Sequence, residues 1–378
     1  THIGPNGKPF TDWTAAEGTP DVIYGWGMPD LDKGMYGPGQ FLDHFEYRLA
    51  EPLDVWSNDI TEAGLQQREK EDKAWMEATK NGTDPDAGGD YTLGDDMVVL
   101  DGNLDFYDNA ISPEQAKQWR AEYYAKRAAY IQNKIDNDLY KGKLVKSGTG
   151  TLVMTGNNSY TGGTEVREGQ LFGFTESFGS GAVNVNGGTF GVLATYNDQF
   201  TQKGELHSVV GGVSRAEAQK ATVVVNDGGT FAVIADQDVQ LKSLTFNEGA
   251  QITVTSLTND AFEQAWDGNV QVGTVTAETL EGANNAIVTP DYALVDHTIT
   301  VDGNKITGVL EKSDKTLADY ANNGNGVSVA NALMADEALF SGLVSATKDE
   351  ARQTIASLAN DIHVTANAMT VANGQSLV

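Results

Sequence analysis

The chain has 378 residues and a formal net charge of −28, and its composition is 40% hydrophobic, 21% charged and rich in glycine, with 42 residues. This composition excludes a disordered chain, and the acidity argues against nucleic acid or an anionic membrane as a partner. Because the chain has no cysteine, a disulfide framework and thiolate chemistry are also excluded.

Residues 1–40 are rich in glycine and proline, and we expect a short strand, a glycine turn and a short helix that starts near Pro29 or Asp30. Forty such residues cannot bury a core alone. The segment is therefore predicted to be the C-terminal remnant of a larger domain. Since the chain also starts without an initiator Met, we expect it to be the middle piece of a longer protein.

Residues 41–147 are predicted to be a charged, partly helical linker or cap. One helix is expected from about Thr61 to Lys80, and a second starts after the N-cap Ser112, with Pro113 at its first position and Gln115 in a capping box. The second helix has one apolar face, formed by Ala121, Tyr124, Ala128, Ile131 and Ile135. We expect this helix to cover the open first coil of the region that follows.

Residues 148–325 contain a repeat in which a glycine precedes a short apolar run. Gly150-Thr151-Leu152 returns as Gly169-Gln170-Leu171, Gly188-Thr189-Phe190, Gly229-Thr230-Phe231 and, more loosely, Gly249-Ala250-Gln251-Ile252. The spacings between these glycines are 19, 19, 41 and 20 residues. We interpret the spacing of 41 residues as two repeats, one of which has a degenerate sequence. Such a period predicts a solenoid of short strands joined by tight glycine turns.

Two features of the repeat region leave alternatives open. The stretch from 196 to 220 interrupts the repeat and is predicted to be a loop from one coil, either a partner-binding loop or a neutral insertion. The turns carry Asn157, Asn158, Asn184, Asn186 and Asn226. These residues are expected either to form hydrogen-bonded ladders between coils or to be simple left-handed turn residues.

Residues 326–378 change to helical spacing. Val329, Leu333 and Ala338 suggest one short amphipathic helix, and a second face is formed by Ala351, Ile355, Leu358, Ile362 and Ala366. We expect a helical junction here.

The sequence offers no catalytic constellation. The five histidines (His2, His44, His207, His297 and His363) are scattered, and no Gly-x-Ser-x-Gly elbow occurs. The run that starts at Asp101 opens like a calcium loop but has Phe106 and Ser112 where glycine and glutamate are needed. A looser calcium site stays an alternative, since Asp95, Asp96, Asp101, Asp105 and Asp108 are close in sequence. We assign no catalytic, cofactor-binding or metal residue.

The segment from Gly148 to Thr164, with Gly-Thr-Leu, Gly-Asn-Asn and Tyr-Thr-Gly-Gly-Thr, resembles the passenger-associated repeat of bacterial autotransporters. The resemblance implies a right-handed parallel β-helix stalk that is exported across the outer membrane through the C-terminal β-barrel of the same precursor. The tail from Thr354 to Met369 is similar to the helical segment that joins such stalks to a barrel.

A second, narrower resemblance concerns the start of the chain. The run from Tyr24 to Leu31, followed by Gly37 to Gln40, looks like the end of a subtilisin-type catalytic domain, and the run from Asp54 to Ile60 looks like its exit into the stalk. That family hydrolyses peptides with an Asp-His-Ser triad. The Gly-Thr-Ser-Met-Ala nucleophile motif does not occur in this chain.

Together these features predict a mainly β chain: a right-handed parallel β-helix, preceded by a helical cap and a small remnant of an α/β subtilase domain, with helices at the C-terminus. The expected function is the non-catalytic stalk of a protease autotransporter, at the Gram-negative cell surface or outer membrane, or secreted. Its expected partners are the upstream catalytic segment and the barrel, with protein substrates met only through the parent protease. The alternatives are a segment that completes the catalytic domain and a carbohydrate-active or adhesive β-helix.

Overall fold

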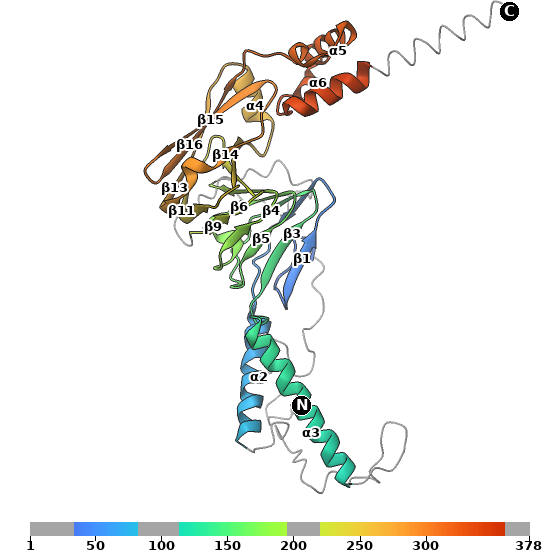
Figure 1. The fold of residues 1–378 in the computed structure, drawn as a ribbon, viewed down its shortest axis with the longest axis vertical. Coiled ribbons are helices and arrows are strands. Elements are labelled where there is room, and N and C mark those ends of the chain that lie inside the picture. The colour runs from blue at the N-terminus through green and yellow to red at the C-terminus, as the bar shows by residue number, and fades with distance from the viewer. Residues whose placement is uncertain (1–33, 82–112, 195–219, 360–378) are drawn as a thin grey trace, which may run out of the picture. The chain divides into compact units, whose positions relative to one another are not determined.

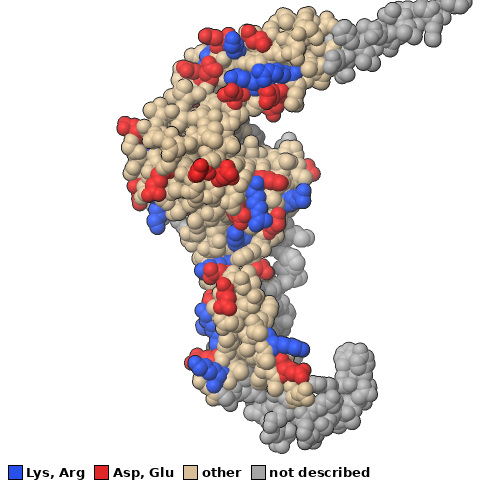
Figure 2. All heavy atoms as spheres, viewed as in Figure 1, with Lys and Arg blue, Asp and Glu red and all other residues tan. Residues whose placement is uncertain are grey.

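The computed structural model describes residues 34–81, 113–194 and 220–359 (Figure 1). These residues separate into two compact units. The first comprises 34–46, 58–81, 113–145 and 156–163, and the second comprises 47–57, 146–155, 164–194 and 220–359. On the face that Figure 2 shows, acidic and basic side chains are interspersed. The acidity of the chain is therefore not gathered into a single patch on that face.

The described strands form one nine-stranded and one seven-stranded sheet. From β1 to β15 the chain visits them alternately, and β16 stays in the first sheet. The strands are β-branched and aromatic runs interrupted by glycine turns. The strands of the first sheet are, in spatial order, β1 (His44–Arg48), β3 (Lys143–Ser147), β5 (Thr164–Val166), β7 (Val183–Val185), β9 (Thr222–Val225), β11 (Asp238–Phe246), β13 (Gln271–Glu281), β16 (Lys305–Lys312) and β15 (Val295–Asp302). Those of the second are β14 (Ile287–Val288), β12 (Gln251–Thr255), β10 (Thr230–Ile234), β8 (Thr189–Leu193), β6 (Gln170–Phe174), β4 (Thr151–Met154) and β2 (Leu53–Trp56).

From β2 to β14, each strand of the second sheet pairs in parallel with the next strand of that sheet. We call one strand of each sheet, taken in chain order with its turns, a rung. The register places equivalent repeat residues side by side, as in the column Leu152, Leu171, Phe190, Phe231 and Ile252. All five side chains are buried. The mainly β class and the parallel pairing that the family resemblance implies are confirmed.

The interpretation of the 41-residue step as two repeats is wrong. Thr189 pairs directly with Thr230 and Phe190 with Phe231, and in the other sheet Val183 pairs with Val223. The step is therefore a single rung whose connection, after β8, is longer than those after β4, β6 and β10. This agrees with the prediction that the stretch from 196 to 220 leaves one coil, although 195–219 lie outside the described residues.

Parallel pairing begins earlier than the predicted stalk. β2 pairs with β4, and β1 and β2 are the edge strands of their sheets. The rung at 148 is consequently not the first rung. The helices α2 (Ala63–Lys80) and α3 (Pro113–Asp136) are inserted in the sequence between β2 and β3.

The first unit contains these two helices, close to the predicted bounds. Trp75 of α2 packs edge-on against Tyr124 of α3, with ring centroids 5.5 Å apart, and Arg127 lies over the Trp75 ring at 4.4 Å. Asp72 accepts a hydrogen bond of 2.8 Å from Tyr140, and burial is the main cause that raises the pKa of this tyrosine. The predicted apolar face of α3 is buried or half-buried from Tyr124 to Ile135, whereas Ala121 is exposed. The predicted cap at Ser112 lies outside the described residues.

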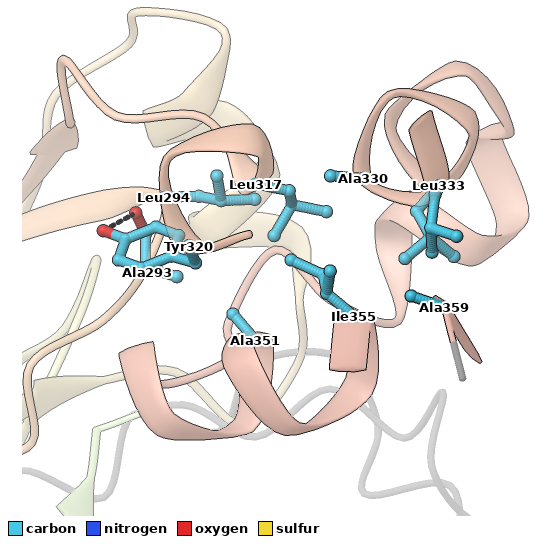
Figure 3. Packing of buried hydrophobic residues seen from close by; sticks show 10 residues of the cluster. Ala293, Leu294, Leu317, Tyr320, Ala330, Leu333, Ala351, Ile355 and Ala359 are labelled. Atoms are coloured by element: carbon cyan, nitrogen blue, oxygen red, sulfur yellow. Dashed lines mark hydrogen bonds between the residues drawn. The ribbon is translucent and has the colours of Figure 1, made fainter. Parts of the chain in front are cut away.

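The C-terminal part of the second unit departs from parallel pairing. β15 and β16 form an antiparallel hairpin that pairs with β13, and α4 (Asp260–Trp266) precedes β13. A helical cluster follows, with η6 (Leu317–Tyr320), α5 (Gly324–Ala335), α6 (Glu337–Ser341) and a helix at 348–359. Figure 3 shows how Leu317, Ala330, Leu333, Ala351 and Ile355 point into the shared apolar core of this cluster.

The predicted helical faces at this end need correction. Val329, Leu333, Ala351 and Ile355 are buried as expected. Ala338 is exposed because it belongs to a separate short helix, α6, and Leu358 is 39% exposed while Ala359 is buried. The buried residues of the last helix are thus spaced by four. Ile362 and Ala366 lie outside the described residues.

Candidate functional site

The turns between the two sheets form a column that continues from rung to rung. At this turn Gly148, Gly169, Gly188, Gly228 and Gly249 all have positive φ, between 63° and 79°. This left-handed conformation is the one in which glycine carries no steric penalty. We call these five residues the glycine column.

The column is tight where successive turns touch. A Cβ atom on Gly169 would lie 2.3 Å from the Gly148 carbonyl oxygen, and one on Gly188 would lie 2.4 Å from the Gly169 carbonyl oxygen. The backbone hydrogen bonds explain this closeness, since Thr189 donates to the Gly169 carbonyl at 2.7 Å and Thr230 to the Gly188 carbonyl at 2.9 Å. Each turn therefore serves as the docking surface for the next.

A buried lysine supports the start of the column. Lys146 is fully buried, and its Nζ donates to the carbonyl oxygens of Ser147, Gly148 and Glu168 at 3.0, 2.8 and 3.2 Å. The Glu168 carboxylate in turn accepts a hydrogen bond of 3.1 Å from the Gly148 amide. Burial lowers the pKa of Lys146, and the nearby Glu168 carboxylate partly opposes this shift. Sequence reasoning missed this residue, although a lysine inside the apolar run of β3 was a visible signal.

A buried carboxylate joins distant parts of the first unit. Glu62 is 3% exposed and accepts hydrogen bonds from the Gly142 amide at 2.7 Å, the Thr161 amide at 2.9 Å and the Thr161 hydroxyl at 2.8 Å. Nearby, the Asn158 side chain accepts from the Ile60 amide at 2.7 Å. Asn158 and Thr161 belong to the Gly-Asn-Asn and Tyr-Thr-Gly-Gly-Thr runs, so these repeat residues hold the segment that leads into α2.

The asparagines at the same turns, two residues before Gly188, Gly228 and Gly249, form a ladder. Asn226 donates from Nδ2 to the Asn186 Oδ1 at 2.7 Å, and Asn247 donates to the Asn226 Oδ1 at 2.6 Å. Asn186 continues the ladder to the Glu165 carboxylate at 3.1 Å. Of the two alternatives left by the sequence, the ladder is confirmed for Asn186 and Asn226, and Asn247 and Glu165 extend it.

The ladder makes a testable prediction about Asn226. In the variant Asn226→Asp, the donor to Asn186 is lost and two acceptors face each other, which we expect to destabilise the fold by about 1 kcal/mol at neutral pH. Only the protonated carboxyl can donate to Asn186, so its folded-state pKa is raised, and the deficit should disappear as the pH falls through that pKa. Urea unfolding at several pH values measures this.

The matched control is Asn269→Asp, which adds the same charge at an exposed position outside the ladder. Equal destabilisation of both variants at neutral pH would show that added negative charge, and not the ladder, causes the effect.

An aromatic column lies inside the rungs. The ring centroids of Phe178 and Phe190 are 4.7 Å apart, those of Phe190 and Phe231 6.3 Å, and those of Phe231 and Phe246 6.1 Å. Aromatic contacts of this kind add to the free energy gained from burial alone. The column therefore couples the rungs that contain Phe190, Phe231 and Phe246 in the core, as the glycines do at the turn.

The first rung holds a smaller polar contact. Tyr47 and Trp56 both donate to one oxygen of Asp54, at 2.8 and 3.0 Å. Burial, with the hydrogen bond to Asp54, raises the pKa of Tyr47 to about 12. Asp54 thus has a structural partner on each of two strands.

Most of the residues that the sequence offers for chemistry lie outside the described part of the chain. His44 is exposed on β1 and His297 is half-buried on β15, while His2, His207 and His363 lie outside the described residues. The calcium candidates Asp95, Asp96, Asp101, Asp105 and Asp108 also lie outside them. Among residues 34–81, 113–194 and 220–359, no three His, Asp or Glu side chains gather as metal ligands would.

One comparison with known families bears on this arrangement. The passenger-associated transport repeat matches residues 144–171, the stretch that contains Lys146, Gly148 and Gly169. A search of curated proteins finds no match. The repeat identifies this part of the chain as an autotransporter passenger repeat region and indicates a secreted or cell-surface location. Within the described parts of the chain, no helix combines the length and apolar character needed to cross a membrane.

Proposed function

We propose that this chain is the β-helical stalk of an autotransporter passenger that carries a subtilisin-like serine protease at the surface of a Gram-negative cell and aids its export. The observation that carries the proposal is the rung pattern itself: parallel strands continue in register on both sides of the matched repeat. The repeat is therefore one member of a longer stack.

The rungs suit export of an unfolded chain. Each new rung docks on the glycine turn and the aromatic column of the rung already formed, and buries apolar side chains worth about 1.5–3 kcal/mol each. Without cysteine, no disulfide can close before the chain has crossed a narrow pore. Folding on the far side then favours outward movement.

The protease part rests on the resemblance at residues 24–60. The described end of that stretch contains β2, and the Asn58 amide donates a hydrogen bond of 3.2 Å to the Tyr36 carbonyl, which supports a defined conformation there. The sequence encoded upstream of Thr1 tests this part, because a Gly-Thr-Ser-Met-Ala motif is expected there. If residues 1–40 complete the catalytic domain, their deletion from the whole precursor abolishes proteolysis; unchanged activity contradicts that role.

The export part is tested in the whole precursor with an N-terminal epitope. We expect the epitope to reach the cell surface, and expect several-fold less surface epitope when Gly169→Val breaks the stack. Gly228→Ala, which leaves the stack intact, serves as the control. Equal surface display of the two variants would exclude a role of stalk folding in export.

The carbohydrate-active alternative gains no support from the described arginine of the repeat region. Arg167 forms an ion pair with Glu165 at 2.8 Å, and Glu165 also ends the asparagine ladder. Arg215 lies outside the described residues.

A further inference from the structure

The last rung is closed by a short antiparallel pairing between two distant segments. Tyr292 pairs with Thr347, the Ala293 amide donates to the Ala346 carbonyl at 2.9 Å, and the Lys348 amide donates to the Asp291 carbonyl at 2.9 Å. We call residues 291–293 and 346–348 the C-terminal latch. Because Thr347 also caps the helix at 348–359 through Glu350, this helix starts directly from the latch.

Tyr292 is the central side chain of the latch. It is 7% exposed, and its hydroxyl donates to the Val254 carbonyl at 3.0 Å. Its ring is packed between Phe262 of α4, with centroids 5.0 Å apart, and His297 of β15, at 5.3 Å. A change at His297 therefore acts directly on the residue that holds the latch.

His297 occupies an apolar position. It lies on the same face of β15 as Val295 and Ile299 and pairs with Leu310 of β16. These three neighbours belong to, or pack against, the apolar cluster that also contains Tyr292, Phe262 and Val344. Its Nε2 atom is buried and has no hydrogen-bond partner within the described structure. A neutral ring fits this site, but a protonated Nε2 would bury a charged donor without an acceptor.

The surrounding charges do not offset this burial. Asp291 and Asp296 favour the charged ring and Lys348 disfavours it, and burial dominates, so the pKa of His297 lies below its ordinary value of 6.5. Asp291 is already paired with Lys348 at 3.1 Å. On the other elements packed here, Lys312 of β16 lies over Trp266 at 4.2 Å, Glu263 of α4 accepts from Ser341, and Glu350 accepts from Thr347.

We propose that His297 makes the C-terminal latch acid-sensitive: protonation of its ring displaces Tyr292 and frees residues 346–348 and the helix that follows. The direction of the pH dependence follows from the linkage between protonation of His297 and stability of the latch. The latch is fully stable above the unfolded-state pKa of 6.5, and loses stability as the pH falls below that value through the lower folded-state pKa. This inference does not depend on the proposed function.

Hydrogen exchange of the full chain, corrected for the intrinsic effect of pH, tests the proposal at about pH 7.5 and about pH 5. We expect the amides of Ala293, Lys348 and the helix at 348–359 to lose protection in acid. The opening equilibrium should change by about tenfold for each unit by which the pKa of His297 is lowered. In His297→Phe, which keeps an aromatic ring against Tyr292, this acid-induced loss should vanish, whereas His44→Phe at an exposed position should leave it unchanged.

An NMR titration of His297 in the unaltered protein gives a second readout that does not depend on a variant. A pKa at or above 6.5, or the same acid-induced loss of protection in His297→Phe as in the unaltered chain, would overturn the proposal.

Discussion

Gly169→Val is expected to remove the cooperative unfolding transition of the rung stack, or to destabilise it by more than about 4 kcal/mol, an effect reserved for mutations that strain or open a core. Gly169 has φ of +67°, where a side chain costs about 1–2 kcal/mol. Its Cβ would also lie 2.3 Å from the Gly148 oxygen and 2.6 Å from the Gly150 oxygen. Both obstacles are backbone atoms, so relief requires that neighbouring rungs separate.

The variant Gly228→Ala separates the conformational penalty of a side chain at positive φ from the steric clash with the neighbouring turn. Gly228 has φ of +76°, but no atom lies within 4 Å of the position of an added Cβ. Only the conformational penalty remains, about 1 kcal/mol. Urea unfolding of both variants measures the difference, and equal midpoints would show that the turns do not dock on one another.

Phe190→Ala is expected to destabilise the second unit by about 3–5 kcal/mol, because it leaves a cavity in the aromatic column. Phe190 is fully buried and contacts the rings of Phe178 and Phe231, so the surrounding rungs cannot close over the space without shifting their register. Phe190→Leu fills most of the volume and should cost less than about 1.5 kcal/mol.

The measurement is the free energy of unfolding from urea titration of both Phe190 variants. A loss of under about 1 kcal/mol in Phe190→Ala, a value typical of exposed positions, would mean that Phe190 does not lie in a packed core. Equal losses of unfolding free energy in the two variants would mean that the side-chain volume restored by leucine does not stabilise this site.

Local features of the fold could be predicted from the sequence. The run Gly188-Thr189-Phe190 predicts a turn followed by a strand because glycine and β-branched or aromatic residues act over two or three positions. The 41-residue step could not be resolved in this way, since a degraded repeat and an inserted segment have the same spacing. The direct pairing of Thr189 with Thr230 decides between them.

Other features were present as signals but were not used. Gly303-Asn304 lies between two alternating runs and is a hairpin signal, and it forms the two-residue turn between β15 and β16. His297 alternates with Val295 and Ile299, which indicates that it faces inward. In the last helix, the periodicity allowed either Leu358 or Ala359 on the apolar face, and packing against Ala351 and Ile355 selected Ala359.

The contacts of the candidate site lay beyond sequence reasoning for a different reason. Glu62 meets Gly142 and Thr161, residues 80 and 99 positions away. A surface glutamate and a buried one look alike in a sequence, because the difference is made by backbone donors that only the folded chain brings together. The same holds for the three carbonyl oxygens around Lys146.

The direct stacking of β8 on β10 is tested most directly by disulfide cross-linking, since the chain has no cysteine of its own. Paired parallel strands lie about 4.8 Å apart, so Thr189→Cys with Thr230→Cys is expected to form a disulfide rapidly on mild oxidation. Thr151→Cys with Thr189→Cys, separated by Gln170 of the strand between them, spans about 9.6 Å and should stay reduced. Failure of the first pair to cross-link, with cross-linking of the second, would contradict the rung order on which the proposed stalk depends.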